Sequence, residues 1–267
     1  MRSKILYGLI AGITALLAMW LPDIAVAQLV DVQIVDDYGG AFRQYNVLPR
    51  TWDSNTHRAY IEAVKGERYG IRVRNNSGKR VGLVIAVDGR NILSGQKSNL
   101  QSNERMYILN PYDSGSYEGW RTGKNVVNKF YFTDAGDSYA GAWGDFTAMG
   151  VIAVAVFFEK YEEEDYSLED ERRFRYPYSG KKEQGKEKSL KGTQSQRSQP
   201  GTGIGEERYS PTRKVEFDAE PRPVEKYFFK YEWRKTLCRK GIIDCRHRPE
   251  NRFWDNDEYV PFPPSRR

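Results

Sequence analysis

The chain has 267 residues, of which 29% are charged and 13% are aromatic, and its formal net charge is +6 at pH 7. It contains two cysteines and two histidines, which excludes a disulfide-framework scaffold, a four-cysteine zinc site and a multi-histidine metal centre. The basic excess is spread along the chain without a domain-scale basic stripe, so nucleic acid is not an expected partner. No cofactor is expected either.

The first 27 residues have the organisation of a signal peptide. Arg2 and Lys4 give a basic start, residues 5–21 carry no charge, and the small residues at 25–27 match a cleavage site. We therefore predict an exported protein, periplasmic or extracellular, without a transmembrane segment once the leader is cleaved. An uncleaved anchor is the alternative, because membrane-spanning helices need about 17–25 apolar residues.

Short β-strands are predicted throughout residues 28–158. In residues 68–74, apolar side chains occupy one face of the strand and three arginines occupy the other. Residues 80–88 and 150–158 are apolar on both faces, which is typical of central strands. Because no helix-length amphipathic segment separates these strands, the sequence predicts an all-β domain, an antiparallel β-sandwich or jelly roll.

The composition changes after the last of these strands. Residues 159–205 are first acidic, then basic, then rich in small polar residues, and they are predicted to form a disordered linker. The linker includes the glycine-rich stretch 201–205, because a phosphate-binding loop would follow a strand and open a helix. Residues 206–267 are predicted to pack back on the sandwich, with strands at 214–217 and 227–233, a disulfide loop and a loose tail.

The two cysteines stand close together in this C-terminal segment. Six residues separate Cys238 from Cys245, which is enough for a turn that joins their sulfurs. Thiols oxidise readily outside the cytoplasm, so this pair is predicted to form a disulfide. The alternative is a cysteine nucleophile assisted by His247, but no third group that would orient the histidine is evident.

Several short stretches of the chain carry a family resemblance. Within residues 57–95 they are Arg58-Ala59-Tyr60, Gly66-Glu67-Arg68-Tyr69 and Val87-Asp88-Gly89-Arg90-Asn91. Further along the chain they are Tyr117-Glu118-Gly119-Trp120-Arg121, Phe130-Tyr131-Phe132-Thr133 and Lys230-Tyr231-Glu232-Trp233 with Cys238. Together they resemble a family of uncharacterised secreted bacterial proteins, which implies export and a β-rich domain of unknown function but no activity.

Two predicted loops, residues 111–121 and 133–145, gather aromatic residues beside carboxylates and glycines. Flat aromatic faces with acceptors at their rim suit a sugar or a peptide, and loops at the end of a sandwich often carry binding sites. The candidate ligand-binding residues are Tyr112, Tyr117, Trp120, Tyr139 and Trp143. The alternative is that the two tryptophans plug the ends of the sandwich, because buried tryptophan is common.

Carboxylates in the same loops offer two further hypotheses. Asp134, Asp137 and Asp145 are candidate ligands for a metal such as Ca²⁺, although their spacing differs from that of the twelve-residue calcium loop. Asp113 and Glu118 are a candidate carboxylate pair for glycoside cleavage, which needs two acids flanking one bond.

These features favour an exported, non-enzymatic β-sandwich module that binds an envelope protein or an anionic or glycan polymer. One alternative is a glycan-active hydrolase that uses the loop carboxylates. Another is a structural or assembly subunit of an envelope complex, for which the aromatic segment 227–233 would supply an apolar contact surface.

Overall fold

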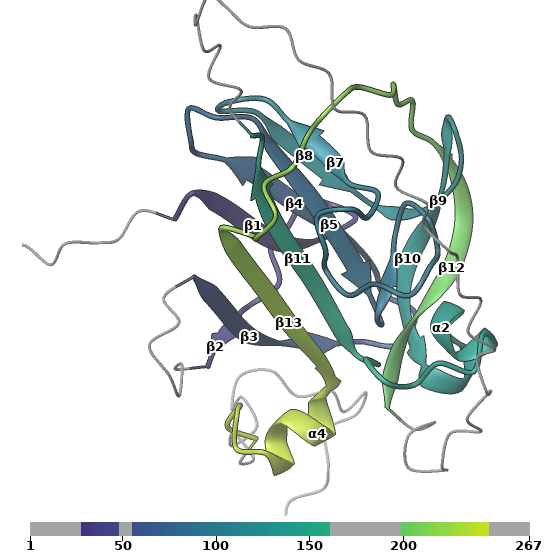
Figure 1. Cartoon of the computed structure of the whole chain (residues 1–267). Coiled ribbons are helices and arrows are strands. Elements are labelled where there is room, and N and C mark those ends of the chain that lie inside the picture. Colours follow the sequence, from purple (N-terminus) through teal and green to yellow (C-terminus); the bar gives the residue numbers. More distant parts are fainter. Residues whose placement is uncertain (1–27, 48–54, 161–198, 246–267) are drawn as a thin grey trace, which may run out of the picture.

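The computed structural model describes residues 28–47, 55–160 and 199–245, which form a two-layer β-sandwich (Figure 1). The predicted all-β fold is confirmed. The predicted leader, most of the predicted linker, the predicted tail and His247 lie outside the described residues. Within the described ranges, no helix is long and apolar enough to cross a membrane.

The first layer, called sheet A, is wholly antiparallel. Its strands are β1 (Val30–Asp36), β4 (Arg68–Asn75), β8 (Ser114–Tyr117), β9 (Gly119–Gly123), β10 (Val126–Asp134) and β12 (Pro200–Tyr209). The order along the sheet is β1-β4-β10-β12, with β8 paired to β4 and β9 paired to β10. The C-terminal part of the chain therefore contributes the last strand of this sheet.

The second layer, called sheet B, is mixed. Its strands are β2 (Tyr45–Asn46), β3 (Thr56–Ala63), β5 (Val81–Val87), β6 (Arg90–Asn91), β7 (Tyr107–Leu109), β11 (Val151–Phe158) and β13 (Glu225–Trp233). Their order is β2-β3-β13-β11-β5-β6, with β7 paired to β5. Only the β3–β13 pair of these named strands is parallel. The predicted strand at 227–233 is thus a central strand, between β3 and β11 (Figure 1).

The core between the sheets follows from the alternation of the strands. In β4, Tyr69, Ile71 and Val73 point inward and are at most 1% exposed, while the intervening arginines are exposed. The Tyr69 ring stacks on Phe130 and Phe132 of β10, at centroid distances of 5.2 and 4.4 Å. Burial of each such large side chain stabilises the fold by about 1.5–3 kcal/mol.

The outer face of sheet B is covered over β5 and β11, which explains why these strands are apolar on both faces. The outward side chains Val84, Ala155 and Phe157 form a second cluster, against which Leu100, Met106 and Ala219 pack. Phe217 covers the same face, since a Cβ on Gly82 would lie 2.7 Å from its ring. The prediction of a strand at 214–217 is wrong, because this segment contributes a covering side chain instead of pairing along a sheet edge.

The predicted linker is wrong at its C-terminal end, because residues 201–205 belong to strand β12. Its glycines serve close packing. A Cβ on Gly201 would lie 2.7 Å from Cβ of Ser138, and a Cβ on Gly203 would lie 2.2 Å from the Tyr131 ring. A stretch whose composition indicates flexibility is therefore a strand whose neighbours leave no room for side chains at its glycine positions.

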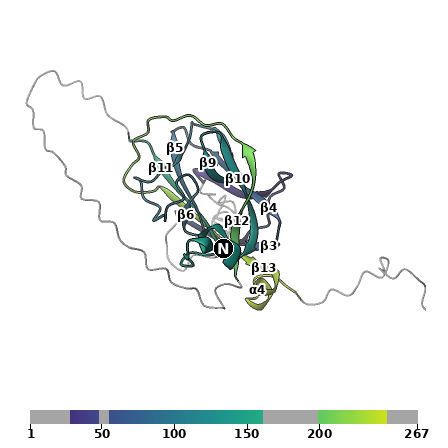
Figure 2. The same cartoon turned by 90° about the vertical axis from the view of Figure 1, so that its right-hand side faces the viewer.

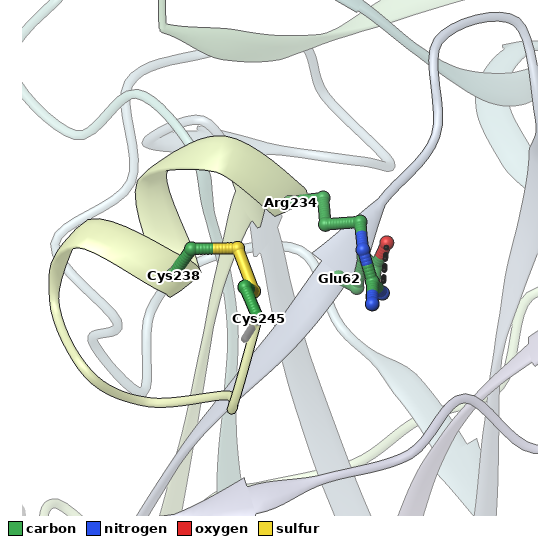
Figure 3. The surroundings of a disulfide bond; sticks show 4 residues. All are labelled: Glu62, Arg234, Cys238 and Cys245. Atoms are coloured by element: carbon green, nitrogen blue, oxygen red, sulfur yellow. Dashed lines mark hydrogen bonds and ion pairs between the residues drawn. A yellow bond between two sulfur atoms is a disulfide. The ribbon is translucent and has the colours of Figure 1, made fainter. Parts of the chain in front are cut away.

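The predicted disulfide is confirmed between Cys238 and Cys245, whose Cα atoms are 5.5 Å apart. Cys238 lies in the short helix α4 (Arg234–Arg239), which directly follows β13, and the disulfide closes the turn after this helix (Figure 3). Arg234 pairs with Glu62 of β3 at 2.9 Å and fixes the start of the helix. Both overall views place α4 at the end of β13, outside the two sheets (Figures 1 and 2).

Candidate functional site

The first predicted loop is largely built into sheet A, because residues 114–117 and 119–123 form β8 and β9. Tyr117 is 8% exposed and Trp120 is 3% exposed, so neither can be a surface contact for a ligand. Tyr112 is 71% exposed, at a turn where its φ is +59°. The structure therefore corrects the prediction for two of the three aromatic residues in this loop.

Trp120 is a core residue that joins three elements. Its indole ring meets Phe130 of β10 edge-on at 5.3 Å and lies 4.4 Å from the ring of Tyr139. Its Nε1 donates a hydrogen bond to the carbonyl oxygen of Gly203 in β12, at 3.1 Å. The apolar body and the polar edge of this side chain are both satisfied inside the protein.

The second predicted loop contains a short 3-10 turn, η2 (Ala135–Asp137), and the single-turn helix α2 (Tyr139–Ala142). Ser138 caps α2, because its hydroxyl oxygen accepts a hydrogen bond from the Gly141 amide at 3.0 Å. The half-buried Tyr139 packs on Trp120 from the α2 side. Trp143 follows the helix and is 59% exposed, with its ring perpendicular to that of Tyr139 at 6.3 Å.

Two buried charged residues lie beside this exposed tryptophan. Arg90 of β6 is 5% exposed, and its guanidinium lies 5.2 Å from the centre of the Trp143 ring. Its Nη1 donates to the carbonyl oxygen of Gly95 at 2.9 Å, but its buried Nε has no acceptor among the residues that the structure describes. Asp145 is 9% exposed, and its Oδ2 is buried without a donor from the described part of the chain.

The carboxylate of Asp145 is held in its ionised form. Its Oδ1 accepts hydrogen bonds from the Thr147 hydroxyl at 2.6 Å and the Thr147 amide at 3.1 Å. Burial acts to raise the pKa of Asp145, but these two hydrogen bonds and the charges of Lys97 and Arg90 lower it below its ordinary value. The ammonium of Lys97 stands 4.0 Å from Oδ2, beyond hydrogen-bond distance.

These side chains form the Trp143 surface, which consists of Arg90, Lys97, Tyr139, Trp143 and Asp145. It combines an exposed indole face with two buried groups next to it, an ionised carboxylate with an unused acceptor oxygen and a guanidinium with an unused donor. Such a combination suits a ligand that has a flat apolar face together with groups that both donate and accept hydrogen bonds.

The three aspartates predicted as metal ligands are not brought together. Asp134 forms an ion pair with Lys65, and Asp137 is exposed on η2. Asp145 belongs to the Trp143 surface. No group of three potential metal-ligating residues occurs in the ranges 28–47, 55–160 and 199–245. The prediction of a metal site at these aspartates is therefore wrong.

The two acids proposed for glycoside cleavage have structural partners. Glu118 pairs with Arg208 of β12 at 3.3 Å. Asp113 is exposed at the turn before β8, where its Oδ1 accepts a hydrogen bond from the Ser114 amide at 2.8 Å. Both carboxylates thus stabilise local structure at the ends of strands of sheet A.

A family model described as Domain of unknown function (DUF7918) matches residues 29–245. The chain belongs to this family. The match extends over both sheets and ends at Cys245, so the DUF7918 domain includes the C-terminal strands and the disulfide. No match is found among curated proteins or among solved structures.

A buried network in the DUF7918 domain holds the Trp143 surface in place. Asp88, fully buried at a φ of +49°, accepts hydrogen bonds from the amides of Gly150 and Thr202, each at 2.7 Å. It also accepts one from the Tyr231 hydroxyl at 2.5 Å. The carboxylate therefore ties the end of the loop that carries Trp143 to β12 of sheet A and to β13 of sheet B.

Burial raises the pKa of Asp88 to about 6, although its three donors act in the opposite direction. The network continues from Asp88 through Tyr231 to the Thr202 hydroxyl, 2.8 Å away, and from there to the Tyr69 hydroxyl at 2.7 Å. Burial likewise raises the pKa of both tyrosines, so both remain neutral donors and acceptors.

Sequence reasoning did not assign Arg90 or Lys97 to the site. Arg90 stands in the stretch Val87-Asp88-Gly89-Arg90-Asn91, one of the stretches that carry the family resemblance. The turn at Asp88 and Gly89 returns the chain so that β6 pairs with the end of β5, beside the loop after α2. The available signal is an arginine directly after an Asp-Gly pair at the end of a predicted central strand.

Proposed function

We propose that this protein is an exported glycan-binding module and that its ligand binds at the Trp143 surface. The observation that carries the proposal is an exposed indole face beside a buried, ionised carboxylate with an unused acceptor oxygen. A pyranose ring has an apolar C–H face, which packs on an aromatic ring, and a rim of hydroxyls that both donate and accept hydrogen bonds.

The groups around Trp143 match these two features of a sugar. One hydroxyl donates to Oδ2 of Asp145, and its neighbour accepts from the Lys97 ammonium, which stands 4.0 Å from that oxygen. Oδ2 is buried, so the proposal requires the side chains around it to move before a hydroxyl can bind. The exposed side chain of Lys97 is one that can move, because exposed side chains change rotamer within nanoseconds. Arg90 lies against the Trp143 ring and limits its rotation.

Export is the second part of the proposal. It is supported by the signal-like organisation of residues 1–27 and by the Cys238–Cys245 disulfide, which needs an oxidising compartment to form and persist. In the periplasm or at the cell exterior, the accessible glycans are envelope polysaccharides. Binding to such a polymer requires no catalytic group.

The proposal is tested with an array of immobilised oligosaccharides and envelope polysaccharide fractions. We expect the protein to retain a subset of these glycans and the Trp143→Ala variant to bind them roughly tenfold more weakly, because the stacking surface is lost. Tyr209→Ala is the matched control, since Tyr209 is 74% exposed and lies outside the Trp143 surface. Full binding by Trp143→Ala, or no glycan retained by the unsubstituted protein, would contradict the proposal.

A further inference from the structure

The outer face of sheet B has a second half, over β3 and β13, that the described segments leave uncovered except at its Glu62 and Glu232 end. There α4 lies over it, with the Lys240 ammonium 5.3 Å from the centre of the Tyr60 ring. This half contains a groove of about 280 Å³, lined among others by Val47, Arg58, Tyr60, Val151, Phe228 and Lys230. The covering residues Leu100, Met106, Phe217 and Ala219 lie over β5 and β11 instead. This second half is called the β3–β13 face.

The strand register sets the pattern of side chains on this face. Tyr227, Phe229 and Tyr231 point into the core, so Phe228 and Lys230 point outward. The parallel pairing places Arg58 beside Phe228 and Tyr60 beside Lys230.

Each of the two neighbouring pairs therefore contains one cation and one aromatic ring, Arg58 with Phe228 and Lys230 with Tyr60. The cation lies on β3 in the first pair and on β13 in the second. Val151 continues the row of Lys230 in β11. The groove thus combines flat apolar walls with two positive charges.

On this face, positive charges lack acidic partners in the groove but are paired with acids at one end. Glu62 and Glu232 form the next row, but each has its own cation, Arg234 at 2.9 Å and Lys240 at 2.7 Å. In the two rows of the groove no acidic residue is present. The groove therefore carries a net positive charge, because the acids of the next row, Glu62 and Glu232, already pair with other cations.

The cation best placed to meet a ligand is Arg58. Its side chain is exposed, its guanidinium lies 5.4 Å from the centre of the Phe228 ring, and it makes no ion pair with a residue that the structure describes. Lys230 is half-buried and donates to the carbonyl oxygen of Met149 at 2.6 Å, so its ammonium is already positioned. A planar guanidinium pairs with a carboxylate or sulfonate through two parallel hydrogen bonds.

We propose that the groove of the β3–β13 face binds a small planar organic anion, an aromatic carboxylate or sulfonate. The anionic group pairs with Arg58 and faces Lys230, and the ring packs against Tyr60, Phe228 and Val151. The volume of about 280 Å³ suits a ligand of one or two fused rings, near the lower limit of small-molecule sites. A sugar is a poorer fit, because its hydroxyls also donate and the Tyr60 hydroxyl is the one side-chain acceptor among the residues that line this groove.

The inference does not rest on the glycan-binding proposal, because the two sites share no residue. The probe is anilinonaphthalene sulfonate, an aromatic anion whose naphthalene sulfonate part has the proposed planar shape and whose fluorescence rises on binding. Naphthoate, with two fused rings and a carboxylate, is the competitor. We expect saturable binding that naphthoate displaces and that Arg58→Gln weakens about tenfold through loss of a charge-assisted pair. Trp143→Ala should leave this binding unchanged.

Arg74→Gln is the matched control, because Arg74 is an exposed arginine on β4 of the other sheet. Phe228→Ala gives a second measurement, expected to weaken binding while near-ultraviolet circular dichroism shows that the fold is intact. Equal binding by the Arg58→Gln and Arg74→Gln variants would overturn the inference. Displacement by decanoate but not by naphthoate would also overturn it, since the site would then recognise an alkyl chain and not a planar ring.

Discussion

Trp120 and Trp143 come from similar local sequences and end in opposite environments. Both have a glycine and an acidic residue within two positions, in Glu118-Gly119-Trp120 and Trp143-Gly144-Asp145. Trp120 is 3% exposed and Trp143 is 59% exposed. Tyr139 contacts both rings, so the two tryptophans are the inner and outer ends of one aromatic row.

The difference between them arises from strand partners that lie far away in the sequence. Trp120 is in β9, where its Nε1 meets the carbonyl oxygen of Gly203 more than eighty positions later in the chain. Trp143 follows a single-turn helix that ends at Ala142, and its ring has Arg90 and Tyr139 beside it. Local sequence therefore indicates an aromatic residue near a turn, while the distant strand decides whether that residue is buried.

The largest expected effect is the loss of stability in Trp120→Ala. Removing this buried indole leaves a cavity and takes away the donor to the Gly203 carbonyl oxygen, so we expect the free energy of unfolding to fall by about 3–5 kcal/mol. Urea denaturation followed by far-ultraviolet circular dichroism measures the change. Trp120→Phe keeps most of the side-chain volume but not the hydrogen bond, so its free energy of unfolding should lie between those of the unsubstituted protein and Trp120→Ala. A loss below about 1 kcal/mol in Trp120→Ala would contradict its place in the core.

The next effect concerns Asp88, which anchors both the strand beneath Trp120 and the loop that carries Trp143. Its pKa of about 6 in the folded protein exceeds the ordinary aspartate value of 3.8, so the folded state binds the proton more tightly than the unfolded state. The contribution of Asp88 to the free energy of unfolding therefore decreases as the pH rises from about 4 to about 6, by roughly 3 kcal/mol.

Denaturation at several pH values measures this effect as the difference between the unsubstituted protein and Asp88→Asn, which cannot titrate there. The asparagine amide would face the Thr202 amide, so the variant should also be less stable at every pH. Parallel pH profiles for the two proteins would show that Asp88 does not titrate in this range.

A smaller effect on stability, but a large one on binding, is expected for Trp143→Ala. The exposed ring contributes one cation–π contact with Arg90 and one edge contact with Tyr139. The free energy of unfolding should change by less than about 1 kcal/mol. Urea denaturation is again the measurement, and a loss as large as that of Trp120→Ala would make Trp143 a structural residue.

The smallest expected effect is a change in the titration of Asp145. Thr147→Val removes the hydroxyl that donates to its Oδ1, so the pKa of Asp145 should rise while the fold persists. Carbon-detected nuclear magnetic resonance of the carboxyl group follows this titration. Thr122→Val is the control, since the exposed Thr122 hydroxyl bonds to Asn128 and not to Asp145. An unchanged pKa in Thr147→Val would show that this hydrogen bond does not hold the carboxylate in its ionised form.

The sequence was sufficient for the β-sandwich because its signal is local. Alternation in residues 68–74 and the two-sided apolar runs at 80–88 and 150–158 each correspond to a strand, and the disulfide followed from two nearby cysteines. Residues 201–205 were misread, because glycines needed for close approach to Ser138 and Tyr131 have the same composition as a flexible linker.

The candidate site was predicted in part. The loop predicts Tyr139 and Trp143, but Arg90 comes from β6 and Lys97 from the segment after it, and neither is predicted. Tyr117 lies in β8 and Trp120 lies in β9. Both strands are short and rich in glycine and polar residues, so the sequence indicates a loop with surface aromatics there. The burial of Trp120 depends on β10 and β12, and that of Tyr117 depends on β4 and β7. Such pairings are not encoded in any local window of sequence.

The position of β13 sets the order in which the molecule can be completed. Because this strand is inserted between β3 and β11, a nascent chain that has not yet reached Glu225 leaves those two strands without the partner that joins them. Asp88 likewise lacks one of its hydrogen-bond donors until Tyr231 of β13 is in place. If the chain crosses a membrane from its N-terminus, as the export proposal requires, sheet B would therefore be completed only after β13 has emerged.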